Sequence, residues 1–318
     1  MITAHIYNAV SAPKLSILIP FYHDDPCDLL RALMAQSEGD VEILLYDDGT
    51  ADAAINAQLQ SIAEAGDAPV TLLFAAKNMG RSYARNSLQA RASAPWILFL
   101  DADMMPEDDE FVSRYRAIID DDGADIIFGG FTMPERVEPK FEIHRAFSAG
   151  SDCLTAEQRS AFGPKYVCSS NLAVRSDILS AQPFDTAFTG WGWEDSEWAA
   201  RVAGKHRLLH LDNPALHLGL ESTDTMLKRF ATSGKNYDRF VRRHPDLAPT
   251  LSLFKAMRVL SKVPFQSVMQ MPLKWIVKSA VMPIGLRLKA LKLWRASWYA
   301  QTCDATQISP LELTEIVS

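Results

Sequence analysis

The sequence is poor in cysteine, with only Cys27, Cys153, Cys168 and Cys303 in 318 residues. Their spacing matches no metal-binding motif, and four cysteines are too few for a disulfide framework in a chain of this length. The first residues also lack the basic and apolar segments of a signal peptide. We therefore expect reduced cysteines and a cytoplasmic location.

Long uncharged apolar runs are also missing. No stretch reaches the roughly 18 residues that a membrane-spanning helix needs, because the candidate at residues 263–273 contains Gln and Pro and is followed by Lys274. No internal repeat or low-complexity segment is found. The G-x-G-x-x-G fingerprint of dinucleotide-binding enzymes is absent after the first apolar run, where Pro20-Phe21-Tyr22 stands instead.

Acidic residues are absent from residues 247–303, although the chain as a whole has a formal net charge of −7. This segment holds nine Lys and Arg residues, whereas residues 1–246 hold 36 acidic and 23 basic residues. The acidic balance argues against a nucleic-acid partner. Tryptophans stand among the bases of residues 250–300, which predicts either a helix on an anionic membrane surface or a packed helical subdomain with its bases facing water.

The composition that remains is that of a globular protein, with 48% hydrophobic and 22% charged residues. Short apolar runs alternate with helical patterns in the first hundred residues, which predicts βαβ units and a mainly parallel sheet. The predicted strands are residues 15–19, 41–46, 70–74 and 96–100, and the predicted helices are residues 28–36, 51–65 and 80–92. Further on, we expect strands at 125–129 and 167–174 and a helix at 222–243.

Two of these strands end in acidic clusters, Asp47-Asp48-Gly49 and Asp101-Ala102-Asp103. Ligands bind outside the carboxyl ends of parallel strands, so the carboxylates should converge. Oxygen ligands suit Mg²⁺ or Mn²⁺. The alternatives are structural, because Asp and Gly favour turns and an aspartate commonly caps a helix, here one predicted to begin at Pro106.

Three other features are candidates for chemistry. Arg81 and Arg85 lie one helical turn apart and could face phosphates or only solvent. His217 stands in an apolar stretch, as a packed residue or as a third metal ligand.

The third is Trp191-Gly192-Trp193-Glu194-Asp195. Its tryptophans could stack on a sugar ring, and a carboxylate at the start of a helix could act as a general base. The alternative is that the acids cap the helix and the tryptophans belong to the core.

In chain order these segments resemble the inverting glycosyltransferases of family 2. The resemblance covers residues 14–220, and the Trp-Gly-x-Glu-Asp segment is also similar to the galactosyltransferase and N-acetylgalactosaminyltransferase branch of this fold. It rests on Ser16–Tyr22, Asp47–Asp52, Asn78–Gly80 with Ala84–Asn86, Ile97–Asp103, Ser170–Arg175, Gly190–Asp195, Arg201 and His217.

The resemblance implies an α/β, GT-A fold, Rossmann-like, with a helical carboxyl-terminal extension. The catalytic domain would cover residues 1–245, with a nucleotide-sugar half at 14–125 and an acceptor half at 126–245. Residues 246–318 would form the basic helical extension.

The resemblance also implies roles for single residues. Asp195 would be the catalytic base and Glu194 would orient sugar or acceptor hydroxyls. Asp103 and His217 would bind Mn²⁺ or Mg²⁺. Acceptor binding would involve Trp191, Trp193 and Glu194, with Trp193 narrowing the acceptor side because it replaces a smaller residue. The nucleotide-sugar-binding residues would be Pro20, Tyr22, Asp48, Arg81, Arg85, Asp101, Ala102 and Asp103.

The function implied is transfer of a sugar from a nucleoside diphosphate, with uracil as the expected base, to a hydroxyl of a glycan or lipid-linked acceptor. Bacterial surface polysaccharide synthesis is the expected setting, with peripheral attachment to the inner face of the cell membrane left open. Two other classes remain: a nucleotidyltransferase, and a non-catalytic protein of similar fold that binds a nucleotide sugar.

Overall fold

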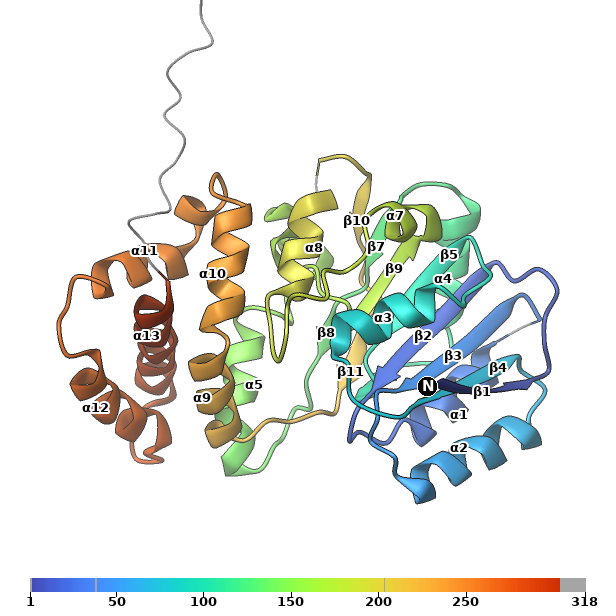
Figure 1. Cartoon of the computed structure of the whole chain (residues 1–318), viewed down its shortest axis with the longest axis horizontal. Coiled ribbons are helices and arrows are strands. Elements are labelled where there is room, and N and C mark those ends of the chain that lie inside the picture. The colour runs from blue at the N-terminus through green and yellow to red at the C-terminus, as the bar shows by residue number, and fades with distance from the viewer. Residues whose placement is uncertain (1, 38, 203, 304–318) are drawn as a thin grey trace, which may run out of the picture. The chain divides into compact units, whose positions relative to one another are not determined.

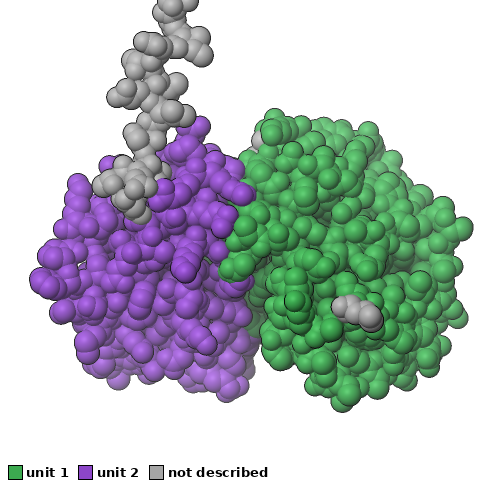
Figure 2. All heavy atoms as spheres, viewed as in Figure 1, with its two compact units in different colours: residues 1–134, 149–189, 194–219 green, residues 135–148, 190–193, 220–318 purple. Residues whose placement is uncertain are grey.

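The computed structural model describes residues 2–37, 39–202 and 204–303 (Figure 1). The chain folds into two compact units, which are coloured separately in Figure 2. Unit 1 comprises Met1–Pro134, Ala149–Thr189 and Glu194–Gly219, and unit 2 comprises Glu135–Ser148, Gly190–Trp193 and Leu220–Ser318. The longest segment of the helical unit begins at Leu220, and two short earlier segments belong to that unit. The catalytic domain at 1–245 stays a prediction.

Unit 1 contains an eight-stranded sheet. Its strands, in spatial order, are β1 (Ile2–Tyr7), β4 (Val70–Ala75), β3 (Val41–Asp47), β2 (Leu15–Phe21), β5 (Trp96–Leu100), β9 (Asn171–Arg175), β7 (Ile126–Phe128) and β10 (Leu208–His210). The four strands predicted in the first hundred residues run parallel to one another, whereas β1 and β9 are antiparallel to their neighbours. The sheet is therefore mixed.

Helices cover both faces of this sheet because the central strands are apolar on both sides. Along β2, Ile17 and Ile19 face one apolar cluster, and Leu18 faces the other. The first cluster includes residues of α1 (Cys27–Gln36), α2 (Ala53–Ala65) and α4 (Phe111–Asp120). The second includes residues of α3 (Arg81–Gln89), α7 (Ser176–Ala181) and α8 (Glu194–Val202).

A small second sheet extends unit 1 beyond the end of β5. It is formed by β6 (Met104–Pro106), β11 (Ala215–His217) and β8 (Phe131–Thr132). The helix predicted from Pro106 is therefore wrong at its start, because this proline ends a strand and α4 begins only at Phe111.

Unit 2 is helical. Its helices are α5 (Glu142–Ala149), α9 (Thr223–Thr232), α10 (Gly234–Arg243), α11 (Ser252–Leu260), α12 (Gln266–Lys278) and α13 (Ile284–Thr302). The helix predicted at 222–243 is two helices, separated at Ser233. No described helix is both long enough and apolar enough to cross a membrane.

The end of β7 is a place where the fold leaves no room for a side chain. A Cβ added at Gly129 would overlap the Tyr115 hydroxyl and would lie 2.7 Å from the carbonyl oxygen of Asn213. We expect Gly129→Ala to lower the free energy of unfolding by about 1–3 kcal/mol, the usual cost of overpacking. Urea unfolding followed by circular dichroism measures it. Gly39→Ala, whose Cβ would meet open space, is the control, and equal stability of the two variants would contradict the prediction.

Candidate active site

The acidic clusters lie at one edge of the sheet. β3, β2 and β5 are adjacent and parallel, so their carboxyl ends share that edge. Asp47 is the last residue of β3, and Asp101 directly follows β5. These carboxylates therefore lie at the carboxyl ends of neighbouring parallel strands, which is where open α/β sheets bind their ligands.

Asp103 and His217 meet because β6 and β11 pair. The antiparallel register places His217 opposite Met104, the residue after Asp103. His217 Nε2 lies 3.3 Å from Asp103 Oδ2. Burial alone would lower the pKa of His217, but the hydrogen bond and charge of Asp103 outweigh it and raise the pKa. The two side chains therefore form a hydrogen-bonded pair beside the edge of the sheet.

Gly219 makes room for this pair. A Cβ at this position would overlap the Asp103 carboxylate. The preceding residue fastens the same loop, since the Leu218 amide donates to the Asp103 carbonyl oxygen at 2.8 Å. Gly219 was missed by sequence reasoning, because nothing in its local sequence indicates that Asp103 lies against it.

The Asp103–His217 pair fits a divalent cation. One carboxylate oxygen and one imidazole nitrogen are common ligands, and the Asp103 carboxylate has its place beside His217 only because residue 219 has no side chain. Within the described part of the chain, no group of three or more His, Cys, Asp or Glu residues forms a metal site. Mg²⁺ sites often use few protein ligands and complete their shell with water and substrate phosphates, so a two-residue site suits a phosphate-bearing ligand.

Arg85 is a buried cation that faces three carboxylates. Only 1% of its side chain is exposed. Its Nη2 donates to Asp101 Oδ1 at 3.1 Å, and its Nη1 lies 3.7 Å from Glu194 Oε1 and 3.6 Å from Asp195 Oδ1. Burial favours the neutral form, but the three acids outweigh it and raise the pKa of Arg85. One guanidinium thus joins the end of β5 to the start of α8.

Arg81, one turn before Arg85 on α3, has different surroundings. Its side chain is 45% exposed, and its Nη1 lies 4.0 Å from Glu194 Oε1. Its charge also contributes to the lowered pKa of Asp103, together with the larger effect of His217 against burial. Arg81 is therefore accessible to an anionic ligand, whereas the contacts of Arg85 are with carboxylates of the protein.

The two acids that begin α8 are held differently. The Ser169 hydroxyl donates to Asp195 Oδ1 at 2.8 Å. Glu194 is buried, and its pKa is raised first by burial and then by the charge of Asp195. Ser169 was also missed by sequence reasoning, although it directly precedes the Ser170-Asn171 segment that carried part of the resemblance.

Asp48 fastens the loop before α3. Its Oδ1 accepts from the Met79 amide and its Oδ2 from the Gly80 amide, both at 2.8 Å. Burial raises the pKa of Asp48, and the two amides act in the opposite direction. The turn expected at Gly49 is present, with φ of 84° and no space for a Cβ beside Lys77. The side chain is thus part of the structure of the site, whatever it binds.

The remaining donor-side candidates lie in unit 1 with these acids. Pro20 is near the end of β2, and Tyr22 follows it with an exposed ring that contacts His23 at 4.0 Å between centroids. Ala102 is buried between the two aspartates. The helix-cap alternative for Asp101 and Asp103 loses its basis, because β6 rather than a helix follows them.

Trp191 and Trp193 belong to unit 2 and pack within it. The Trp193 ring lies 4.6 Å from the Tyr237 ring, and its Nε1 donates to Tyr299 Oη at 3.1 Å. The Trp191 ring lies 5.5 Å from that of Phe230. Both indoles are only half-buried, so much of their surface serves core packing and part of it stays open. Their assignment to acceptor binding stays a prediction.

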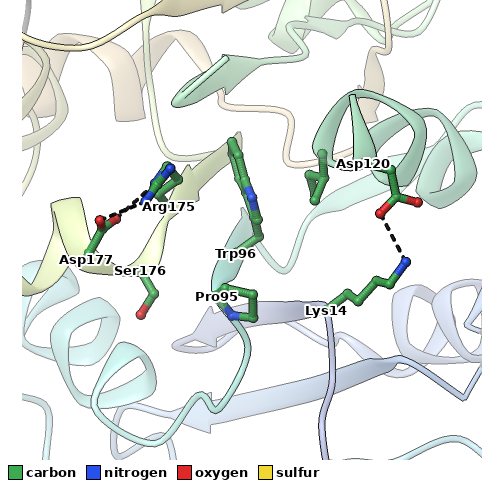
Figure 3. A pocket seen from close by; sticks show the side chains of 8 residues that line it. Lys14, Pro95, Trp96, Asp120, Arg175, Ser176 and Asp177 are labelled. Atoms are coloured by element: carbon green, nitrogen blue, oxygen red, sulfur yellow. Dashed lines mark hydrogen bonds and ion pairs between the residues drawn. The ribbon is translucent and has the colours of Figure 1, made fainter. Parts of the chain in front are cut away.

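A hollow of about 480 Å³ lies elsewhere on unit 1 (Figure 3). It is lined by residues at the start of β2 and β5, including Lys14 and Trp96, and so lies at the other end of these strands from the acids. Two ion pairs, Lys14–Asp120 and Arg175–Asp177, occupy its rim at 3.0 Å each (Figure 3). It contains none of the predicted site residues.

Comparison with known proteins settles the family. A family model described as glycosyl transferase family 2 matches residues 16–181. The chain belongs to this family. No curated protein sequence matches it significantly.

Solved structures show the same fold at low sequence identity. Mannosyltransferase PcManGT from Pyrobaculum calidifontis, solved with GDP-Man and Mn²⁺, has a TM-score of 0.56 and 14% identity, with 90% of this chain and 86% of that chain covered. TarS from S. aureus has a TM-score of 0.51 and 16% identity, with 91% and 54% covered. The GT-A fold expected from the resemblance is thereby confirmed.

Replacing Arg85 should destabilise unit 1. In Arg85→Met, Asp101, Glu194 and Asp195 would lose the buried counter-charge that they share, at a cost of about 3–5 kcal/mol for breaking a buried ion pair. The pKa of Glu194, which burial and the charge of Asp195 already raise, would rise further without Arg85. The folded protein would then bind more protons than the unfolded chain, so the deficit should shrink as the pH falls toward 4.

Urea unfolding at several pH values measures this effect. Arg207→Met, which breaks exposed ion pairs with Asp122 and Asp125, is the matched control and should cost under about 1 kcal/mol. A deficit for Arg85→Met that is equally small, or that grows on acidification, would contradict the assignment.

Proposed function

We propose that the protein is an inverting glycosyltransferase that moves a sugar from a nucleoside-diphosphate sugar to an acceptor hydroxyl. One observation carries the proposal: a single buried guanidinium links Asp101, beside the candidate cation pair, to Asp195, the candidate base. The groups that would act on the leaving group and on the nucleophile therefore belong to one connected cluster in unit 1. Membership of family 2 supports the class of reaction.

On the donor side, Asp103 and His217 would hold Mn²⁺ or Mg²⁺, which when bound neutralises charge on a departing diphosphate. Arg81 is the exposed cation that would contact the same phosphates. Pro20, Tyr22 and Asp48 would surround the base. PcManGT, solved with GDP-Man and Mn²⁺, supports a nucleotide-sugar donor of this kind, and uracil is the base that the resemblance favours.

On the acceptor side, Asp195 would take the proton of the attacking hydroxyl. Its Oδ1 is held by Ser169 and Arg85, so Oδ2 is the oxygen we assign to the acceptor. The acceptor oxygen forms a bond to the anomeric carbon as the bond to the diphosphate breaks, which inverts the configuration. An aspartate suffices as base because the hydroxyl becomes acidic only as the new bond forms.

Glu194 would orient sugar or acceptor hydroxyls. Its pKa is raised by burial and by the charge of Asp195, and its Oε1 faces both Arg81 and Arg85. Trp191 and Trp193 would border the acceptor with their open surface. A glycan or lipid-linked acceptor in bacterial surface polysaccharide synthesis is the setting we propose, with the protein in the cytoplasm and attached peripherally to the membrane. The galactosyltransferase-like branch is part of the same proposal.

The products separate this function from the two alternatives. A glycosyltransferase releases a nucleoside diphosphate, a nucleotidyltransferase releases pyrophosphate from a nucleoside triphosphate, and a binding protein releases neither. A thermal-shift screen of nucleoside diphosphates and their sugars, with Mn²⁺ and with Mg²⁺, identifies a donor for the assay.

Asp195→Asn tests the base. We expect nucleoside-diphosphate release to fall by about 10²–10⁴-fold, the usual contribution of a general base, while donor binding is kept. Asp177→Asn, an exposed aspartate of α7, is the control. Activity of Asp195→Asn close to that of the control would defeat the assignment.

Asp103→Ala and Gly219→Ala test the cation pair from two sides. The first removes a ligand, and the second displaces it by overlap. We expect both to weaken Mn²⁺-dependent binding of a nucleoside diphosphate, the second by about 10–100-fold, as for other groups that orient a ligand. Isothermal titration measures binding, with Gly123→Ala, which has space for a methyl group, as the control. Unchanged affinity in both variants would count against the site.

A further inference from the structure

Exposed apolar side chains are concentrated in one part of unit 2. Of the sixteen large apolar residues that are exposed among those described, ten lie between residues 259 and 293. They are Val259, Val263, Phe265, Val268, Met271, Trp275, Val281, Ile284, Leu286 and Leu293. Such a concentration on an otherwise ordinary surface indicates a binding region.

The clearest part of this region is the outer face of α12, which we define as Phe265, Val268, Met271 and Trp275. Val268, Met271 and Trp275 are spaced i, i+3 and i+7 and so share one side of the helix. Their exposed fractions are 68%, 75% and 61%, and that of Phe265, directly before α12, is 80%.

The other side of α12 is occupied by the core of unit 2. Leu273 and Val277 are buried there in one apolar cluster with residues of α5, α9 and α13. The helix is thus anchored on one side, and its opposite side presents large apolar groups outward.

The segment that contains α12 has basic residues but no acid, over residues 247–303. Lys274 precedes Trp275 and is exposed. Five other bases of this segment are exposed, namely Lys255, Arg258, Lys262, Lys289 and Lys292. Lys278 pairs with Asp224, and Arg287 is buried against Glu142. The charge that remains is positive, and it calls for an anionic partner.

We propose that the outer face of α12 binds the surface of an anionic lipid bilayer. Phe265, Met271 and Trp275 would enter the boundary between headgroups and acyl chains, and the lysines would contact lipid phosphates, as an amphipathic helix does when it lies in the interface. This proposal rests on the proposed function, because a lipid-linked acceptor would lie at such a surface. The residues that would bind the bilayer are different from those proposed for catalysis.

The same charges argue against a second copy of the chain as the occupant. Two such faces brought together would place bases against bases with no acid of residues 247–303 between them, and like charges oppose association. The tryptophans of residues 250–300 do not all have the same surroundings. Trp294 is buried and donates to the Leu227 carbonyl oxygen at 3.0 Å, so it serves the core, and Trp275 takes the place at the membrane.

Flotation of the full chain with lipid vesicles tests the proposal. We expect binding to vesicles that contain phosphatidylglycerol, weakened by salt, and little binding to phosphatidylcholine alone. The double variant Met271→Ser/Trp275→Ser should bind at least about tenfold more weakly, since it removes two large apolar groups. Ile6→Ser, a change at an exposed apolar residue of β1, is the matched control. For charge, Lys274→Glu should weaken binding and Lys205→Glu, on unit 1, should not.

Depth and specificity come from a second measurement. Spin-labelled lipids should quench part of the tryptophan fluorescence of the wild type, and Trp275→Phe should keep vesicle binding but lose that quenching. Equal binding to neutral and anionic vesicles, or unchanged binding of the double variant, would overturn the proposal. So would a lipid-free dimer in sedimentation that the double variant dissolves, because the face would then join two copies.

Failure of this inference is distinguishable from failure of the proposed function. Release of nucleoside diphosphate with a soluble acceptor should be the same in the wild type and in Met271→Ser/Trp275→Ser. Absence of that activity in the wild type would refute the proposed enzymatic function. Absence of vesicle binding alone would refute only the proposal that the outer face of α12 binds a membrane.

Discussion

The Arg85 guanidinium is the interaction on which the site of unit 1 depends. Asp101 and Asp195 come from segments more than ninety residues apart, and each would repel the other at close range without a cation between them. Because Arg85 is buried, the attraction is little screened by solvent. The sheet supplies the place for the acids, and the buried arginine supplies the counter-charge between them.

Two short backbone features complete the arrangement. The pairing of β6 with β11 brings His217 to Asp103, and the missing side chain of Gly219 leaves that carboxylate its space. β11 and Gly219 form the last part of unit 1, and the longest segment of unit 2 begins at Leu220. The residues that we propose for catalysis and the outer face of α12 therefore belong to different units, and each can be altered separately.

Much of this could be predicted from the sequence, and the reasons are physical. The strands β2 to β5 are short apolar runs, a pattern set by burial on both faces and visible in one dimension. In two of them, β3 and β5, the apolar run leads directly into an aspartate. The position of Asp101 and Asp103 at a strand end followed directly. The different surroundings of Arg81 and Arg85 could not be predicted. The two residues are equivalent by helical spacing and differ only in their contacts with the start of α8.

Other parts depend on contacts that no local pattern records. Ser169 acts on Asp195 through a hydrogen bond between residues 26 apart in the chain, and Gly219 acts through a strand pairing across more than a hundred residues. Within residues 250–300, Trp275 and Trp294 look alike in the sequence, since both stand among lysines and leucines. Only the packing of α13 against α9 distinguishes the core residue from the outward one.

The loop fastened by Asp48 has a mechanical consequence. Its carboxylate grips the amides of Met79 and Gly80, and the next residue in the chain is Arg81. A shift of Asp48 at the end of β3 would therefore displace the peptide groups of Met79 and Gly80, and these lead directly into the first turn of α3. A ligand that moved Asp48 would thereby change the position of the exposed Arg81 side chain.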